Sequence, residues 1–128
     1  MAVRTRLIQE REWIPEQTTL AYRARLVDEQ GLFLTSASLF GLTLSLYALA
    51  LSLPILNDVE GINILNMDRG SFDANGYLVV TLRPADNVLF ESGRREEHHV
   101  MLIQWTYANG EKAGAHEVEF VVKNLGRV

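Results

Sequence analysis

The sequence predicts an all-β protein, organised as a single antiparallel sandwich of about seven strands that follows an N-terminal arm. Several segments alternate apolar with polar residues, which is the pattern of strands buried on one face. Reversal signals such as Asn109-Gly110 separate these segments, roughly every 8–12 residues. The chain of 128 residues has the size of one domain, so one core is expected.

Residues 1–19 are predicted to form the arm, and residues 20–128 the sandwich domain. The arm mixes charges with the isolated apolar run Trp13-Ile14-Pro15, and Pro15 would stop a helix begun upstream. One interpretation is a frayed terminus. The other is a docking arm whose Trp13 is buried by a partner, because aromatic residues anchor interfaces. The sequence leaves both open.

The first strand is predicted at residues 20–26, where apolar residues alternate with Arg23 and Arg25. Leu20, Tyr22, Ala24 and Leu26 would share the buried face. Asp28-Glu29-Gln30-Gly31 then supplies a turn, since Gly31 can adopt a positive φ.

No charged residue occurs between Gln30 and Asp58, so this window could be a membrane helix or β structure. Leucines at helical spacing keep a single-pass anchor over residues 32–56 as an alternative. Strands are favoured because Ser and Thr are frequent and because Gly41 and Pro54 interrupt a helix. Alternating leucines change phase near Tyr47-Ala48, which indicates a bulge or a tight turn.

Later strands are predicted at residues 62–67, 77–82, 99–107 and 116–123. The first of these would be a short edge strand, and the turn 73–76 would precede the second. On the third, alternation places His99, Met101, Ile103, Trp105 and Tyr107 on one face, so Trp105 is expected in the core. Asn109-Gly110 would reverse the chain into the last strand.

Charge and composition argue against several functions. Residues 1–30 are neutral, and the rest of the chain carries the net charge of −4, so nucleic-acid binding is not expected. Without cysteine, neither disulfides nor thiolate chemistry can contribute.

One cluster, residues 94–99, concentrates possible metal ligands and acid–base groups. Adjacent His98 and His99 would leave a strand on opposite faces, which prevents chelation by the pair. The cluster is therefore interpreted as a solvated loop that enters a strand. No phosphate loop or nucleophile elbow occurs. We expect no enzyme activity, no metal and no cofactor.

Five stretches carry a resemblance to a known family. The runs 25–31 and 42–47 resemble the opening of small phage-encoded proteins, and the runs 96–99, 104–110 and 114–125 resemble their closing segment. These relatives are immunoglobulin-like β-sandwich proteins found among the virion structural genes of tailed bacteriophages. The resemblance covers roughly residues 20–125, implies the immunoglobulin-like fold, and transfers no catalytic residues.

The resemblance implies a non-enzymatic virion protein that is made in the host cytoplasm, with capsid decoration or cementing as the leading role. Many copies would bind a major capsid or tail protein, and repetition would raise the strength of attachment. The residues expected to bind the partner are Trp13, Ile14 and Pro15 in the arm and Arg94 and Arg95 in the exposed loop.

Two alternatives stay open beside decoration and the membrane anchor. The protein could belong to the neck, tail or baseplate. It could also recognise a host receptor or glycan through loops at one end of the sandwich. That second role calls for exposed loop aromatics, and Phe72 is nearly the only one that the sequence predicts.

Overall fold

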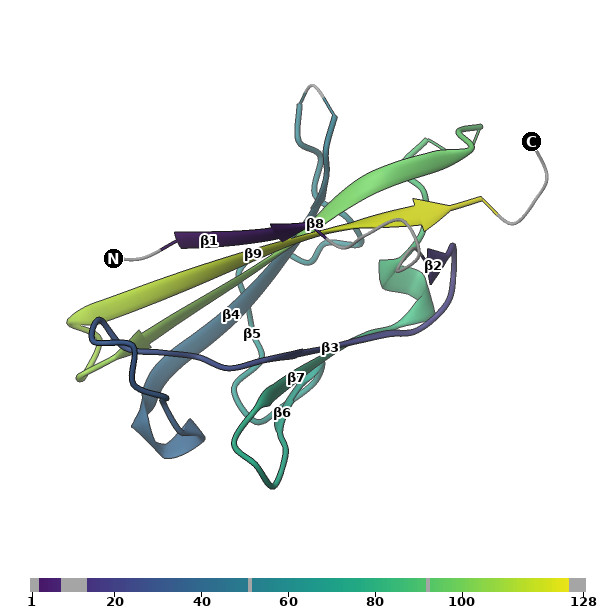
Figure 1. Ribbon diagram of the computed structural model, residues 1–128. Coiled ribbons are helices and arrows are strands. Elements are labelled where there is room, and N and C mark those ends of the chain that lie inside the picture. The colour runs from purple at the N-terminus through teal and green to yellow at the C-terminus, as the bar shows by residue number, and fades with distance from the viewer. Residues whose placement is uncertain (1–2, 8–13, 51, 92, 125–128) are drawn as a thin grey trace.

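The computed structural model describes residues 3–7, 14–50, 52–91 and 93–124 (Figure 1). Their regular structure consists of strands and short 3₁₀ turns, so the all-β prediction is confirmed. The strands are β1 (Val3–Leu7), β2 (Ile14–Pro15), β3 (Leu20–Ala24), β4 (Leu39–Ala48), β5 (Ile62–Asn63), β6 (Gly70–Phe72), β7 (Leu78–Leu82), β8 (Glu96–Tyr107) and β9 (Lys112–Lys123). The 3₁₀ turns are η2 (Ser36–Ser38) and η3 (Pro84–Asp86).

The strands form two sheets. The larger has the order β1-β9-β8-β4-β5, and β2 also pairs with β9. The smaller has the order β3-β7-β6. Neighbouring strands are antiparallel, except that β1 and β2 run parallel to β9.

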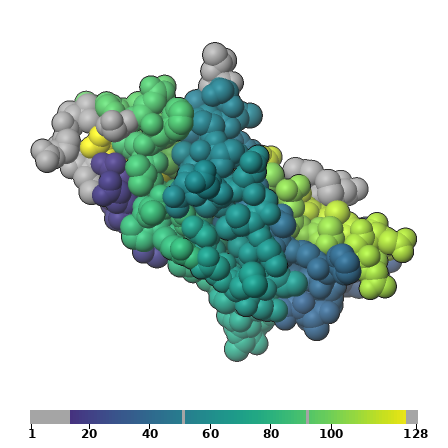
Figure 2. Space-filling view, turned by 180° about the vertical axis from the view of Figure 1, so that it is seen from behind, coloured from purple at the N-terminus to yellow at the C-terminus, as the bar shows by residue number. Residues whose placement is uncertain are grey.

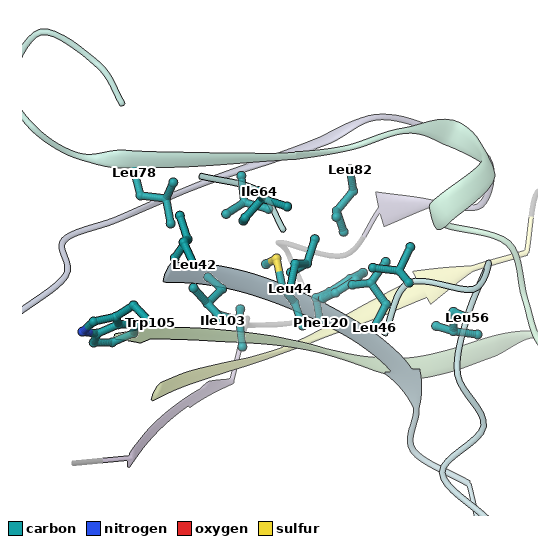
Figure 3. Close-up of a cluster of buried hydrophobic side chains, with 14 of the residues drawn as sticks. Leu42, Leu44, Leu46, Leu56, Ile64, Leu78, Leu82, Ile103, Trp105 and Phe120 are labelled. Atoms are coloured by element: carbon teal, nitrogen blue, oxygen red, sulfur yellow. The ribbon is translucent and has the colours of Figure 1, made fainter. Parts of the chain in front are cut away.

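The hydrophobic core lies between the two sheets (Figure 3). β4 contributes Leu42, Leu44 and Leu46 at alternating positions, and the facing β7 contributes Leu78 and Leu82; all five are buried. Each such leucine stabilises the fold by roughly 1.5–3 kcal/mol when removed from water. Strand alternation therefore produces the apolar layer that holds the sheets together.

β8 and β9 are long strands joined by a tight reversal, as predicted. Trp105 on β8 is buried in the core, and its ring lies directly over Gly114 of β9. A β-carbon at Gly114 would lie 2.5 Å from that ring, so this close approach requires glycine. The predictions that Trp105 belongs to the core and that Asn109-Gly110 turns the chain are confirmed.

The uncharged window forms β4 and loops. No helix within the described residues is both long and apolar enough to span a membrane. The register of β4 shifts between Leu39 and Gly41, and β4 ends at Ala48. A turn follows at once, in which Leu53 N–H donates to the carbonyl of Ala50. The predicted phase change therefore marks the end of a strand, and the bulge lies at its other end.

The arm lies differently from the expected extended segment outside the sheets. Its described parts, β1 and β2, pair with the free edge of β9 (Figure 1). The backbone of β9 would otherwise leave its edge unpaired, so these strands satisfy its hydrogen bonds. Ile14 is buried and belongs to the core. Whether residues 1–19 fold as a separate unit stays a prediction.

Candidate interaction surface

Four of the residues predicted to bind a partner lie near the last residues of β9: Ile14, Pro15, Arg94 and Arg95. On one side of β9, Ile14 pairs with Val122 and Pro15 with Lys123. Ile14 points into the core and Pro15 is half-buried. Ile14 therefore contributes to stability and is not available to a partner, in contrast to its predicted role. Trp13 lies outside the described residues.

The loop that carries Arg94 and Arg95 lies on the other side of β9. Asn124 N–H donates to the carbonyl of Arg95 at 2.8 Å, and Asn124 Nδ2 donates to the carbonyl of Arg94 at 3.0 Å. These bonds hold the loop backbone and leave both arginine side chains exposed. The structure thus brings the arm and the arginine loop together across β9. We call this region, residues 14–18, 87–91, 93–97 and 122–124, the arm end.

A buried asparagine joins the arm to the same region. Gln17 N–H donates to the carbonyl of Asn87 at 2.7 Å, and Asn87 Nδ2 donates to the carbonyl of Thr18 at 2.7 Å. The Asn87 side chain is fully buried. Because buried polar groups are costly unless they are hydrogen-bonded, this reciprocal pair fixes the path of the chain into β3.

Glu97 organises the loop that precedes β8. Its carboxylate accepts hydrogen bonds from Phe90 N–H at 2.7 Å, Glu91 N–H at 2.9 Å and His99 Nε2 at 2.7 Å. Both Glu97 and His99 are buried. The carboxylate therefore holds residues 90–91 against the start of β8, although these two residues belong to no strand.

Burial and hydrogen bonding act on this pair in opposite directions. Burial favours the neutral form of Glu97, but the three N–H donors outweigh it and lower the pKa of the carboxyl. Burial lowers the pKa of His99, and the neighbouring carboxylate reverses this only in part. Neutral His99 then donates from Nε2, and its Nδ1 is buried without a hydrogen-bond partner in the described part of the chain.

The exposed part of the arm end combines apolar and cationic groups. Val88 and Phe90 expose apolar side chains in the same segment, between η3 and β8, that carries the exposed Arg94 and Arg95. Arg94 forms a solvent-exposed ion pair with Glu91 at 3.1 Å. Aromatic and arginine side chains are enriched where proteins bind one another. This composition suits protein–protein contact.

The interpretation of residues 94–99 as a solvated loop that enters a strand is wrong for Glu97, which is buried on β8, whereas His99 lies on the same buried face as Met101, as predicted. Arg94, Arg95, Glu96 and His98 are exposed as expected, and His98 and His99 do lie on opposite faces. The alternation that placed His99 with Met101 on the buried face, continued two residues upstream, would have included Glu97. That signal was present in the sequence.

The opposite end of the molecule, which we call the hairpin end, contains residues 25–40, 73–77 and 107–112. Phe33, in a loop, is 61% exposed, and Phe40, near the start of β4, is 66% exposed, so exposed aromatics are more frequent than the sequence indicated. The Arg25 guanidinium carbon lies 3.9 Å from the centroid of the Phe33 ring and 4.6 Å from that of Tyr77. These contacts are within the range of cation–π attraction.

No protein-family model matches this chain, and none of the curated proteins matches it. Among the described residues, no group of three or more His, Asp or Glu side chains is arranged to hold a metal ion. Function is therefore inferred from the fold, the exposed surfaces and the resemblance of the sequence.

Proposed function

We propose that this protein is a non-enzymatic structural component of a tailed-bacteriophage virion, with capsid decoration or cementing as its role. The sequence resemblance over roughly residues 20–125 supports the virion setting. Many copies would each make a modest contact with a capsid protein, and repetition would make the attachment strong. A position in the neck, tail or baseplate would use the same kind of contact.

The strand order supports an immunoglobulin-like sandwich as part of this proposal. In immunoglobulin constant-type domains, strands B, E and D share one sheet and strands C, F and G share the other. The orders β3-β7-β6 and β4-β8-β9 correspond to these two sets. The chain departs from antibody domains in lacking cysteine and in carrying its buried tryptophan on β8, the equivalent of strand F.

The observation that carries the binding role is the composition of the arm end. Exposed Phe90 and the arginines Arg94 and Arg95 lie on a loop whose backbone is held by Glu97 and Asn124. A held loop loses less conformational entropy on binding than a free one. The surface is therefore organised before a partner arrives.

Co-sedimentation tests the proposal. Purified protein should co-sediment with particles that lack it, at a saturating copy number that matches a repeated position on the capsid, and should then be visible there by electron cryomicroscopy. Saturation at a few copies with density at the neck or tail would favour the second position. Failure to bind any virion protein would contradict the proposal.

Host-surface recognition is the second candidate, and the exposed aromatic rings of Phe33 and Phe40 at the hairpin end favour it. Aromatic rings provide apolar contact area with little loss of side-chain freedom. Under this alternative, isolated protein would bind host cells directly, and substitution of Phe33 and Phe40 with serine would abolish cell binding without changing attachment to particles.

A further inference from the structure

A short apolar loop projects from the body of the molecule between β4 and β5. Figure 1 shows its described part rising clear of both sheets, and Figure 2 shows the same part projecting from the body of the molecule. Three of its described residues, Leu49, Leu53 and Ile55, are exposed. We call residues 49–50 and 52–55 the leucine loop. Exposed apolar side chains gathered on a projection are a mark of an interaction site.

Hydrogen bonds give the leucine loop a defined conformation. Leu49 N–H donates to the carbonyl of His98 at 2.8 Å, and Ala48 N–H donates to the carbonyl of Pro54 at 3.0 Å. Leu53 has a φ of 47°, in the left-handed region that leucine rarely adopts. The surrounding bonds hold this unfavourable conformation, and the Leu53 side chain is exposed.

The charges near the leucine loop restrict the kind of surface that can bind it. No residue from 31 to 57 is charged, whereas Asp58 and Glu60, at the base of the loop, are acidic and exposed. The described part of the leucine loop is thus apolar, and the residues at its base are negative. An anionic lipid surface would be repelled by this base. An apolar pocket whose rim carries lysine or arginine would match both parts.

We propose that the leucine loop is a plug that inserts into an apolar pocket with a basic rim on a neighbouring virion protein. Leu53 supplies the apolar contact, and Asp58 and Glu60 face the cationic rim. The inference rests on the proposed function, since the neighbour is a virion protein. It adds a contact separate from the arm end and states the chemistry of the partner.

Particle binding by matched variants tests the plug. Isotope-labelled protein is mixed with particles that lack it, and bound protein is separated by sedimentation. Leu53→Asn removes the apolar side chain, and asparagine tolerates a positive φ, so the loop is preserved. Met67→Asn is the control, because Met67 and Leu53 are each 51% exposed. We expect the Leu53 variant to bind at least about tenfold more weakly and the Met67 variant to bind like the natural chain.

Charge substitution and salt test the rim. Asp58→Asn combined with Glu60→Gln should weaken binding and reduce its dependence on salt, because charged rims act mainly through association rate. If the natural chain binds and all of these variants bind equally well, the plug is wrong and the proposed function stands. If the natural chain does not bind, both are wrong. A dimer that Leu53→Asn dissolves, or binding to neutral lipid vesicles, would assign the loop to another occupant.

Discussion

The two ends of the molecule are stabilised in different ways. At the hairpin end, Glu29 forms an ion pair with Lys112 and accepts a hydrogen bond from the Tyr107 hydroxyl; the Glu29 and Lys112 side chains are exposed, whereas Tyr107 is buried. The hydrogen bond with Lys112 is the main reason why the pKa of Glu29 falls to about 2. At the arm end, the buried side chains of Glu97 and Asn87 hold the loops instead.

The two ends should differ in how rigidly they hold their exposed residues. Exposed ion pairs contribute little stability and can be replaced at small cost. A buried carboxylate that accepts three hydrogen bonds cannot be removed without leaving buried donors unpaired. The arm end therefore holds its exposed residues in place more firmly than the hairpin end does, which is what a preformed contact surface requires.

The largest expected effect lies in the shared core beneath both ends. Trp105→Ala removes a buried ring that packs over Gly114 and donates from Nε1 to the carbonyl of Val27 at 3.3 Å. The loss should be about 3–5 kcal/mol of unfolding free energy, measured by urea denaturation. Gln104→Ala, an exposed neighbour on β8, is the control and should change stability little. A folded Trp105 variant that only loses a partner would show that this face binds.

Removing the buried carboxylate should come next. Glu97→Ala leaves the N–H groups of Phe90 and Glu91 and the His99 ring without their acceptor. A loss of about 3 kcal/mol is expected, together with faster amide hydrogen exchange at residues 90–91. The control is Glu96→Ala, since Glu96 is adjacent but exposed. Equal effects of the two substitutions would mean that the arm end is not organised by Glu97.

Lowering the pH should reduce the stability of the protein, because His99, buried beside the arm end, binds a proton less readily in the folded chain. Its pKa in the folded protein is lowered by burial, below the value of 6.5 expected in the unfolded chain. The unfolded chain therefore binds the extra proton, and stability falls as the pH drops below about 6.5. The slope from one group cannot exceed about 1.4 kcal/mol per pH unit. Thermal unfolding from pH 7 to 5 should show this loss in a His98→Gln variant and lack it in a His99→Gln variant.

The smallest effect compares a glycine at each end. Gly110 at the hairpin end has a φ of 88°, and an added β-carbon would lie 3.3 Å from the Phe40 ring. Gly93 at the arm end has neither constraint. Gly110→Ala should cost about 1 kcal/mol and Gly93→Ala should be neutral or slightly stabilising. If Gly93→Ala is the more damaging change in thermal unfolding, the arm-end loop is more restricted than its backbone indicates.

The sequence predicted the hairpin end better than the arm end, because turns depend on local chemistry. Gly31 and Gly110 both adopt positive φ where turns were expected, β3 exposes Arg23, and β9 buries Val118, Phe120 and Val122, as predicted. Such features need only neighbouring residues. The pairing of β1 and β2 with β9 joins segments about a hundred residues apart. The arm has no alternation of apolar and polar residues from which this pairing could be predicted.

The arm-end polar residues were missed for a related reason. Asn87 and Glu97 are residue types that are mostly exposed, and only their long-range partners make burial favourable. Ile14 was expected to bind a partner because it belongs to the isolated apolar run of the charged arm, yet it pairs with the edge of β9 and is buried in the core. The exposed positions of Arg94 and Arg95 agree with the sequence, and their binding role stays a prediction.

One measurement tests most directly the claim that the arm end is the binding end. Particles that lack the protein are titrated with two double variants, Arg94→Glu with Arg95→Glu at the arm end and Phe33→Ser with Phe40→Ser at the hairpin end, after both are shown to melt like the natural chain. We expect the arginine variant to lose at least about tenfold in affinity and the phenylalanine variant to bind normally. Normal binding by the arginine variant, with loss in the phenylalanine variant, would contradict the account.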